Sequence, residues 1–168
     1  MSEPQAGLTA ERLREVLSYH KLSGKFTWLI HRNKSLVGKV AGTIDSNGYV
    51  LIRIDGRLYR ACRLAYLYVE GMWPAHQIDH KNLDKADDAW LNLRPATNSQ
   101  NSMNKAILKA NTSGFKGVYW LKRERKWLAA ITVNKKLKRL GTFRDREAAY
   151  RSYLCAAEKL HGEFARAV

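Results

Sequence analysis

Residues 77–104, QIDHKNLDKADDAWLNLRPATNSQNSMN, hold a mixture of polar side chains that few hydrophobic cores need. Asp79 and His80 stand side by side. A lone Asn92 follows twelve residues after His80, and Asn101 follows nine residues after that. We expect the rest of the chain to be organised around this stretch.

The local sequence predicts two short strands and a helix here. Residues 77–80 read as a strand, residues 91–95 as its return, and residues 81–90 as a polar connection between them. Thr97 has the side chain of a helix N-cap, ahead of a helix that runs through Met103. If the hairpin and the helix fold onto one another, their polar side chains point into the angle between them.

These residue types suit the hydrolysis of a phosphodiester. A histidine can take a proton from water, and a divalent cation can stabilise the phosphate and the leaving oxygen. Oxygen ligands of the Asp and Asn type suit Mg²⁺ or Mn²⁺ rather than zinc. An asparagine carbonyl can also accept the proton on the far imidazole nitrogen and so fix the ring. The chemistry is complete with a single histidine.

The charge of the chain points to a polyanionic partner. The sequence has 30 Lys and Arg against 15 Asp and Glu, which gives a net charge of +15. Such a surplus attracts polyanions, of which nucleic acid is the commonest. The surplus lies mostly in residues 105–168, which carry 16 basic and 5 acidic side chains, whereas residues 1–104 carry 14 and 10.

Several classes of protein are excluded by composition. No apolar run approaches the roughly 18 to 20 residues that span a bilayer, and the polar start MSEPQAG lacks the apolar stretch of a signal peptide. We expect a cytoplasmic protein, in the host cell if a phage encodes it. Cys62 and Cys155 lie far apart with no CxxC pair, so we expect reduced, buried packing residues rather than zinc ligands.

The amino-terminal half predicts helices and hairpins. Residues 8–19 read as a helix capped by Thr9, and residues 26–30 as a strand. Residues 49–60 read as a hairpin around the Asp-Gly pair at positions 55 and 56. Residues 61–70 read as a helix that stops at Gly71.

The carboxy-terminal part predicts a small sheet and one helix. Residues 115–120, 127–133 and 137–143 read as strands. A helix follows with Asp145 as its cap and Gly162 at its end. Lys and Arg on one sheet face fit a surface that contacts nucleic acid.

The spacing of Asp79, His80, Asn92 and Asn101 resembles the HNH endonuclease motif in its H-N-N form, seen in phage homing endonucleases. The likeness extends upstream through SGKFTW, AGTIDSNGYVLIRIDGRLYRACRLAYLYVEGMWP and IDHKN. It implies a ββα-metal site with His80 as general base and Asn92 as the residue that holds His80. It also implies Asp79 and Asn101 as ligands of one Mg²⁺ or Mn²⁺ ion, and cleavage of DNA to 5′-phosphate and 3′-hydroxyl ends.

The carboxy-terminal segments NTSGFKGVYW, RKWLAAITV, KRLGTF and EAAYRSYLCAAEKLHGEFA resemble the ethylene-response-factor type of DNA-binding domain. In that family a three-stranded sheet lies in the major groove and one helix supports it from behind. Trp120 and Trp127 could contact DNA or be buried beneath the helix, because such a sheet buries one face on its helix and exposes the other. By resemblance the DNA contacts are Lys116, Tyr119, Trp120, Lys122, Arg125, Trp127, Lys136 and Lys138.

The chain departs from the HNH family pattern at three places. Cys62 stands where the family usually has a histidine, in the segment Cys-Arg-Leu-Ala-Tyr. Leu83 stands where a glycine is common, and Asp88 and Ala89 stand where Asn and Arg are common. The chain therefore lacks the histidine and the arginine that are usual at these places.

We accordingly predict an α+β protein. Residues 1–60 form an α/β scaffold, residues 61–106 the nuclease core, residues 107–112 a linker, and residues 113–168 the DNA-binding sheet and helix. The expected partner is double-stranded DNA, bound by a monomer or by a dimer that assembles on DNA, with no membrane and no small-molecule cofactor. The alternative is a DNA-binding protein with a vestigial nuclease site, and a weaker one is an RNA-binding protein.

Overall fold

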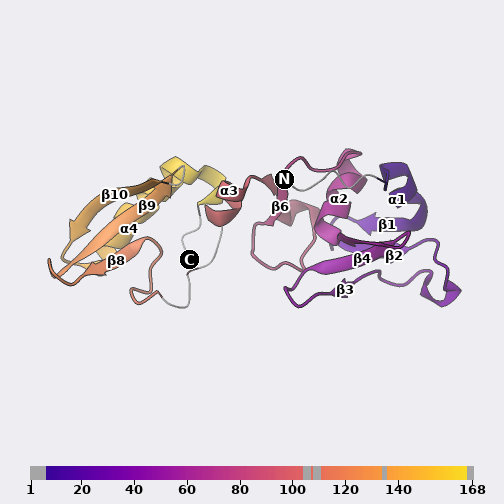
Figure 1. Cartoon of the computed structure of the whole chain (residues 1–168), viewed down its shortest axis with the longest axis horizontal. Coiled ribbons are helices and arrows are strands. Elements are labelled where there is room, and N and C mark those ends of the chain that lie inside the picture. The colour runs from indigo at the N-terminus through magenta and orange to yellow at the C-terminus, as the bar shows by residue number, and fades with distance from the viewer. Residues whose placement is uncertain (1–6, 104–106, 108–110, 134–135, 166–168) are drawn as a thin grey trace. The chain divides into compact units, whose positions relative to one another are not determined.

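The computed structural model describes residues 7–103, 107, 111–133 and 136–165, which belong to two compact units (Figure 1). The first unit is Met1–Ala96 and the second is Thr97–Val168. The mixture of helices and strands confirms the predicted α+β class. The finer division at residues 60 and 106 stays a prediction, and residues 108–110 of the predicted linker lie outside the described residues.

The first unit begins with helix α1 (Ala10–Val16), whose N-cap is Thr9 as predicted. The predicted helix over residues 8–19 is wrong at its end, because β1 (Leu17–His20) is a strand that pairs antiparallel with β2 (Lys25–Trp28). Leu17 and Tyr19 are buried in the same core as their cross-strand partners on β2. Burial on a sheet thus outweighs the helical pattern of these residues.

A second sheet follows, after the short 3₁₀ helix η1 (Lys34–Leu36). It contains β3 (Thr43–Ile44), β4 (Val50–Ile54) and β5 (Arg57–Arg60), and the β4–β5 hairpin is the predicted one. Asp55 and Gly56 have φ angles of 46° and 81°, as a two-residue turn of this type requires. Helix α2 (Ala61–Glu70) comes next and ends at Gly71 with φ 76°, which confirms that prediction.

One hydrophobic core joins these elements to the last hairpin of the unit. Leu13 of α1, Ile52 of β4 and Leu64 of α2 are fully buried in it. Ile78 of β6 (Gln77–His80) and Leu93 of β7 (Leu93–Ala96) belong to the same core. The β6–β7 hairpin, which carries Asp79 and His80, is therefore anchored on a packed scaffold; the 3₁₀ helix η2 (Trp90–Asn92) leads into β7.

The second unit contains a three-stranded sheet and a long helix. Helix α3 (Asn98–Met103) precedes β8 (Val118–Leu121), β9 (Lys126–Val133) and β10 (Lys136–Phe143), in the sheet order β10-β9-β8. Helix α4 (Arg146–His161) follows with Asp145 as its cap, and η3 (Gly162–Phe164) comes after it. Val118, Ala129 and Ile131 of the sheet pack with Ala149 and Tyr153 of α4. This confirms the prediction of three antiparallel strands on one helix.

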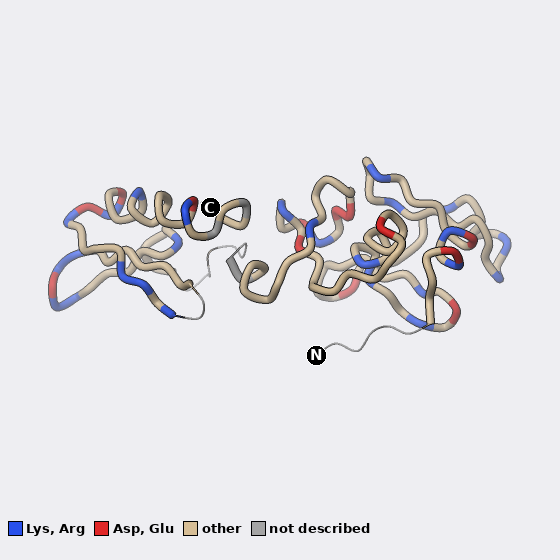
Figure 2. Tube along the Cα trace, turned by 90° about the horizontal axis from the view of Figure 1, so that it is seen from above, with Lys and Arg blue, Asp and Glu red and all other residues tan. Residues whose placement is uncertain are grey.

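No helix in the described ranges is both long enough and apolar enough to cross a bilayer. Lys and Arg positions, blue in Figure 2, occur on the strands, turns and helix of the second unit.

Candidate active site

Asp79 and His80 lie next to each other on β6, and both side chains are buried. Successive side chains of a strand point to opposite faces. The two residues therefore meet different neighbours: Asp79 stands opposite Arg94 of β7, whereas His80 faces helix α2 and the loop that follows β6.

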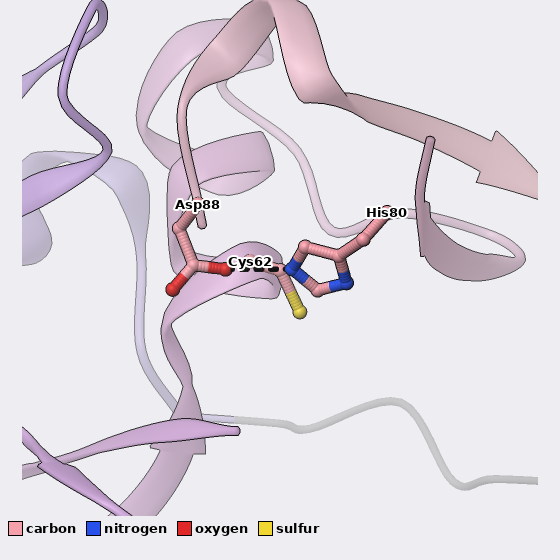
Figure 3. Close-up of side chains that lie close together, drawn as sticks. All are labelled: Cys62, His80 and Asp88. Carbon is pink, nitrogen blue, oxygen red and sulfur yellow. Dashed lines mark hydrogen bonds and ion pairs between the residues drawn. The ribbon is translucent and has the colours of Figure 1, made fainter. Parts of the chain in front are cut away.

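The imidazole of His80 is held by a carboxylate. Its Nε2 lies 3.0 Å from Oδ1 of Asp88, and only 4% of His80 and 2% of Asp88 are exposed (Figure 3). Burial raises the pKa of the Asp88 carboxyl, while the hydrogen bond with His80 opposes that rise. The other oxygen of this carboxylate, Oδ2, is buried and has no hydrogen-bond partner in the described part of the chain.

Cys62 is the third member of this cluster. It lies in the first turn of α2, and its Sγ and one ligand atom each from His80 and Asp88 lie within 4.8 Å of one another. Burial raises the pKa of the Cys62 thiol to about 12. Cys62 is thus buried and reduced, as predicted, whereas Cys155 is exposed and the prediction of burial is wrong for it.

The β1–β2 hairpin holds the segment that carries Asp88. The phenol of Tyr19 donates a hydrogen bond of 2.7 Å to the carbonyl of Asp88, and the N–H of Trp90 donates one of 2.9 Å to the carbonyl of Lys21. Gly24, with φ 70°, lies directly against the backbone of Asp88 and Ala89. We name these three contacts, of Tyr19, Lys21 and Gly24, the hairpin clamp. It ties the site to residues that are about 70 positions away in sequence.

Asn92 organises the loop between β6 and β7. Its Oδ1 accepts a hydrogen bond of 3.0 Å from the N–H of Asn82, and its Nδ2 donates one of 2.7 Å to the carbonyl of Asp87. Leu83, where a glycine is common in the family that the sequence resembles, has the positive φ of 66° that favours glycine. Asn92 thus fixes the path of the chain toward Asp88, and its predicted direct hold on His80 stays a prediction.

Asp79 is engaged by an arginine across the hairpin. Nε and Nη2 of Arg94 each lie 2.9 Å from Oδ2 of Asp79, and both residues are buried. Asn101 belongs to α3 in the second unit, where its N–H donates to the carbonyl of Thr97. The pairing of Asp79 with Asn101 as metal ligands stays a prediction.

The predicted DNA contacts are spread over the sheet of the second unit. Trp127 packs against the core cluster beneath α4, and its ring lies 4.8 Å from that of Trp120. Because residues opposite each other on paired strands share a face, Lys138 lies on the side of Ile131, which packs against α4, and Arg139 lies on the other side. The eight predicted DNA contacts lie before β8 (Lys116), in β8 (Tyr119, Trp120), in the β8–β9 turn (Lys122, Arg125), in β9 (Trp127) and in β10 (Lys136, Lys138).

Asp88 and the hairpin clamp were missed by the sequence analysis. Asp88 was noted only as a departure from a family pattern, since a lone carboxylate in a polar loop gives no signal of the histidine it will meet. The phenol, the carbonyl and the glycine of the clamp carry no signal in sequence either, because each acts through its position in the folded unit.

Comparison with known proteins gives three findings. Residues 59–103 match a family model described as HNH endonuclease. The chain is 36% identical over 97 residues to Protein 3.8 of Escherichia phage T7, which covers 54% of this chain and 74% of that protein. It is 29% identical over 143 residues to the uncharacterized HNH endonuclease L560 of Acanthamoeba polyphaga mimivirus, covering 84% of this chain and 74% of that protein.

Among solved structures, the chain is similar to the HNH homing endonuclease I-HmuI, in a structure described as showing DNA binding and cleavage. The TM-score is 0.42 at 19% identity, and the similarity covers 86% of this chain and 84% of that one.

Proposed function

This chain belongs to the HNH endonuclease family, and from that premise we propose that it hydrolyses phosphodiester bonds of double-stranded DNA with the help of one divalent cation. The observation that carries the proposal is the buried His80–Asp88 hydrogen bond, on the strand that also holds Asp79. A buried, oriented imidazole beside a carboxylate is the arrangement that a general base needs.

His80 acts as the base through Nδ1. Asp88 accepts the proton of Nε2, which leaves the lone pair of the neutral imidazole on Nδ1. From that position Nδ1 takes a proton from the water that attacks phosphorus. Asp88 fixes the direction of the ring and stabilises the imidazolium that forms, while Asn92 keeps the loop in place.

Asp79 and Asn101 supply the ligands for the cation. A carboxylate and an amide oxygen form a hard donor set of the kind that Mg²⁺ and Mn²⁺ prefer. Arg94 fixes the carboxylate of Asp79 within the hairpin, so that it is preorganised. When bound, the cation would neutralise charge on the phosphate and on the leaving 3′-oxygen, which gives 5′-phosphate and 3′-hydroxyl ends.

The second unit is the DNA-binding part of the enzyme. Its three-stranded sheet and its long helix are elements that the sequence resemblance to the ethylene-response-factor type of domain implies, which supports this assignment. Its surplus of Lys and Arg attracts the phosphate backbone. We infer an enzyme of the homing type that acts as a monomer or as a dimer assembled on DNA. Residues 61–106 would be its nuclease core and residues 113–168 its binding domain.

Plasmid cleavage tests the proposal. The purified chain should nick or linearise supercoiled plasmid with Mg²⁺ or Mn²⁺, and a chelator should stop the reaction. If the protein shifts duplex DNA in a gel mobility assay but does not cut it with either ion at the same concentration, the proposed nuclease function is wrong. The alternative described next is then favoured.

The alternative is a DNA-binding protein whose nuclease site is vestigial. One observation favours it: the charge of the Asp79 carboxylate is already compensated by Arg94. The two functions differ in the plasmid assay, because only the enzyme produces chelator-sensitive nicks. A preference for duplex RNA over duplex DNA in a competition assay would indicate an RNA-binding protein.

Replacing Gly24 by alanine should disable the enzyme through the hairpin clamp. A Cβ at this position would overlap the backbone of Asp88 and Ala89, so this backbone or the β1–β2 turn must shift. We expect the shift to disturb the hydrogen bond between Asp88 and His80. We expect the rate of plasmid nicking to fall at least about tenfold, the lower end for loss of an orienting partner.

Gly71→Ala is the matched control for this substitution. Gly71 has a similar φ, 76°, but nothing lies within 4 Å of an added Cβ. Both substitutions should lower the free energy of unfolding by about 1–2 kcal/mol through the strained φ, and Gly24→Ala should lose more because of the overlap. Gly71→Ala should keep its nicking rate. A wild-type rate for Gly24→Ala would remove the hairpin clamp from the mechanism.

Two charges of the β8–β9 turn should contribute to DNA binding. Lys122 and Arg125 are exposed there, and Arg125 has φ 51°, so glycine is its compatible replacement. In the Lys122→Ala/Arg125→Gly variant, the slope of log K against log salt should become shallower by about 1.8, because each lost phosphate contact removes about 0.9.

The Arg151→Ala/Lys159→Ala variant removes the same charge from exposed positions of α4. Its slope, measured by fluorescence anisotropy on the same duplex, should stay close to that of the wild type. Equal slopes in both variants would mean that the turn does not contact phosphate.

A further inference from the structure

Three side chains from different parts of the first unit form a compact set of metal-ligand types. Cys62 comes from α2, His80 from β6 and Asp88 from the loop before η2. We call this set the Cys–His–Asp cluster. One possible ligand atom from each lies within 4.8 Å of the others, and all three residues are buried (Figure 3).

The donor set differs from that of Asp79 and Asn101. A thiolate, an imidazole and a carboxylate together are ligands that Zn²⁺ accepts, whereas Mg²⁺ prefers oxygen alone. Zinc bonds of roughly 2.0–2.3 Å place the ligand atoms about 3.3–3.8 Å apart in a tetrahedron. The ligand atoms, at most 4.8 Å apart, therefore need to approach one another by no more than about 1.5 Å to hold such a cation.

Two further observations point to a ligand at this place. The Oδ2 atom of Asp88 is buried without a hydrogen-bond partner, although Asp88 is only 2% exposed. A cavity of about 260 Å³ is lined by Asp88 and by Ala61, the neighbour of Cys62, together with residues of β2 and β4. This cavity borders the cluster at Asp88 and is large enough to hold a water molecule there.

We propose that the Cys–His–Asp cluster binds one thiophilic divalent cation of the Zn²⁺ class, and that this cation switches the nuclease off. The second part rests on the proposed function of His80. A neutral imidazole has one N–H and one lone pair. A cation on Nε2 takes the lone pair there and leaves the proton on Nδ1, so Nδ1 cannot accept a proton from water.

Cobalt binding tests the site without any DNA. The sequence has two cysteines, so in the Cys155→Ser variant a thiolate-to-Co²⁺ charge-transfer band in the near ultraviolet can come only from Cys62. Stoichiometric Co²⁺ should produce this band, and Zn²⁺ should displace it. Absence of the band would overturn the site, and this measurement does not depend on the stability of any Cys62 variant.

Zinc inhibition tests the switch. Plasmid nicking is measured with Mg²⁺ in excess, and the rate of each protein is compared with its own zinc-free rate. The Zn²⁺ concentration that halves the rate should be at least about tenfold higher for Cys62→Ala than for the wild type. The same concentration for Cys155→Ser should match the wild type. Equal inhibition of all three proteins would overturn the switch. A cobalt band in a protein that never cuts DNA would support the metal site and contradict the proposed nuclease function.

Discussion

Replacing His80 by alanine should lower the rate of plasmid cleavage by roughly 10²- to 10⁴-fold, which is the usual contribution of a positioned general base. The side chain is the one imidazole in the described part of the chain that is both buried and paired with a buried carboxylate. Initial rates of nicking at saturating Mg²⁺, for wild type and variant at equal concentration, give the ratio directly.

His76→Ala is the control for His80→Ala. His76 lies four residues earlier, and its side chain is exposed. We expect its nicking rate to stay within about twofold of the wild type, as is usual for a surface substitution. If His76→Ala lost as much activity as His80→Ala, the base would be assigned to the wrong histidine; full activity in His80→Ala would exclude His80 as the base.

Replacing Arg94 by methionine should cost about 3–5 kcal/mol of stability, because it leaves the carboxylate of Asp79 buried without its cationic partner. Adding Asp79→Asn should recover part of this loss, since the charge is then removed as well. Urea unfolding followed by tryptophan fluorescence measures both effects. In a Trp120→Phe/Trp127→Phe background the remaining tryptophans, Trp28, Trp73 and Trp90, all report on the first unit.

The exposed ion pair between Arg12 and Asp55 is the comparison for this result. Nε and Nη2 of Arg12 contact the two oxygens of Asp55 at 3.1 and 3.0 Å, and the two side chains are about half exposed. Arg12→Met should hardly move the urea midpoint, because solvent screens such pairs. Equal shifts for Arg12→Met and Arg94→Met would show that burial is not what makes the Asp79–Arg94 pair matter.

Features with strong local causes could be predicted from the sequence. Asp55 and Gly56 need positive φ at two successive positions, and few residue pairs accept that, so the β4–β5 hairpin was visible in advance. Gly71 and Asp145 mark helix ends by the same kind of local chemistry. The motif around Asp79 and His80 was recognisable because its spacing repeats a known family pattern.

Features with tertiary causes could not be predicted in this way. Residues 17–20 continue a helical pattern, and only the partner strand β2 turns them into a strand. Asp88 became a partner of His80 because the loop folds back over α2, where Cys62 also lies. The sheet face of each basic residue in β10 depends on the register with β9, which the sequence does not contain.

The hairpin clamp has a consequence for engineering this nuclease. The segment matched by the family model, residues 59–103, includes His80 and Asp88 but none of the clamp residues. A graft of that segment into another scaffold would transplant the base and its carboxylate while leaving Asp88 without the phenol of Tyr19 and the surface at Gly24. A portable cassette from this chain therefore has to include the β1–β2 hairpin, and with it the buried residues of α1 that share its core, rather than only the recognisable motif.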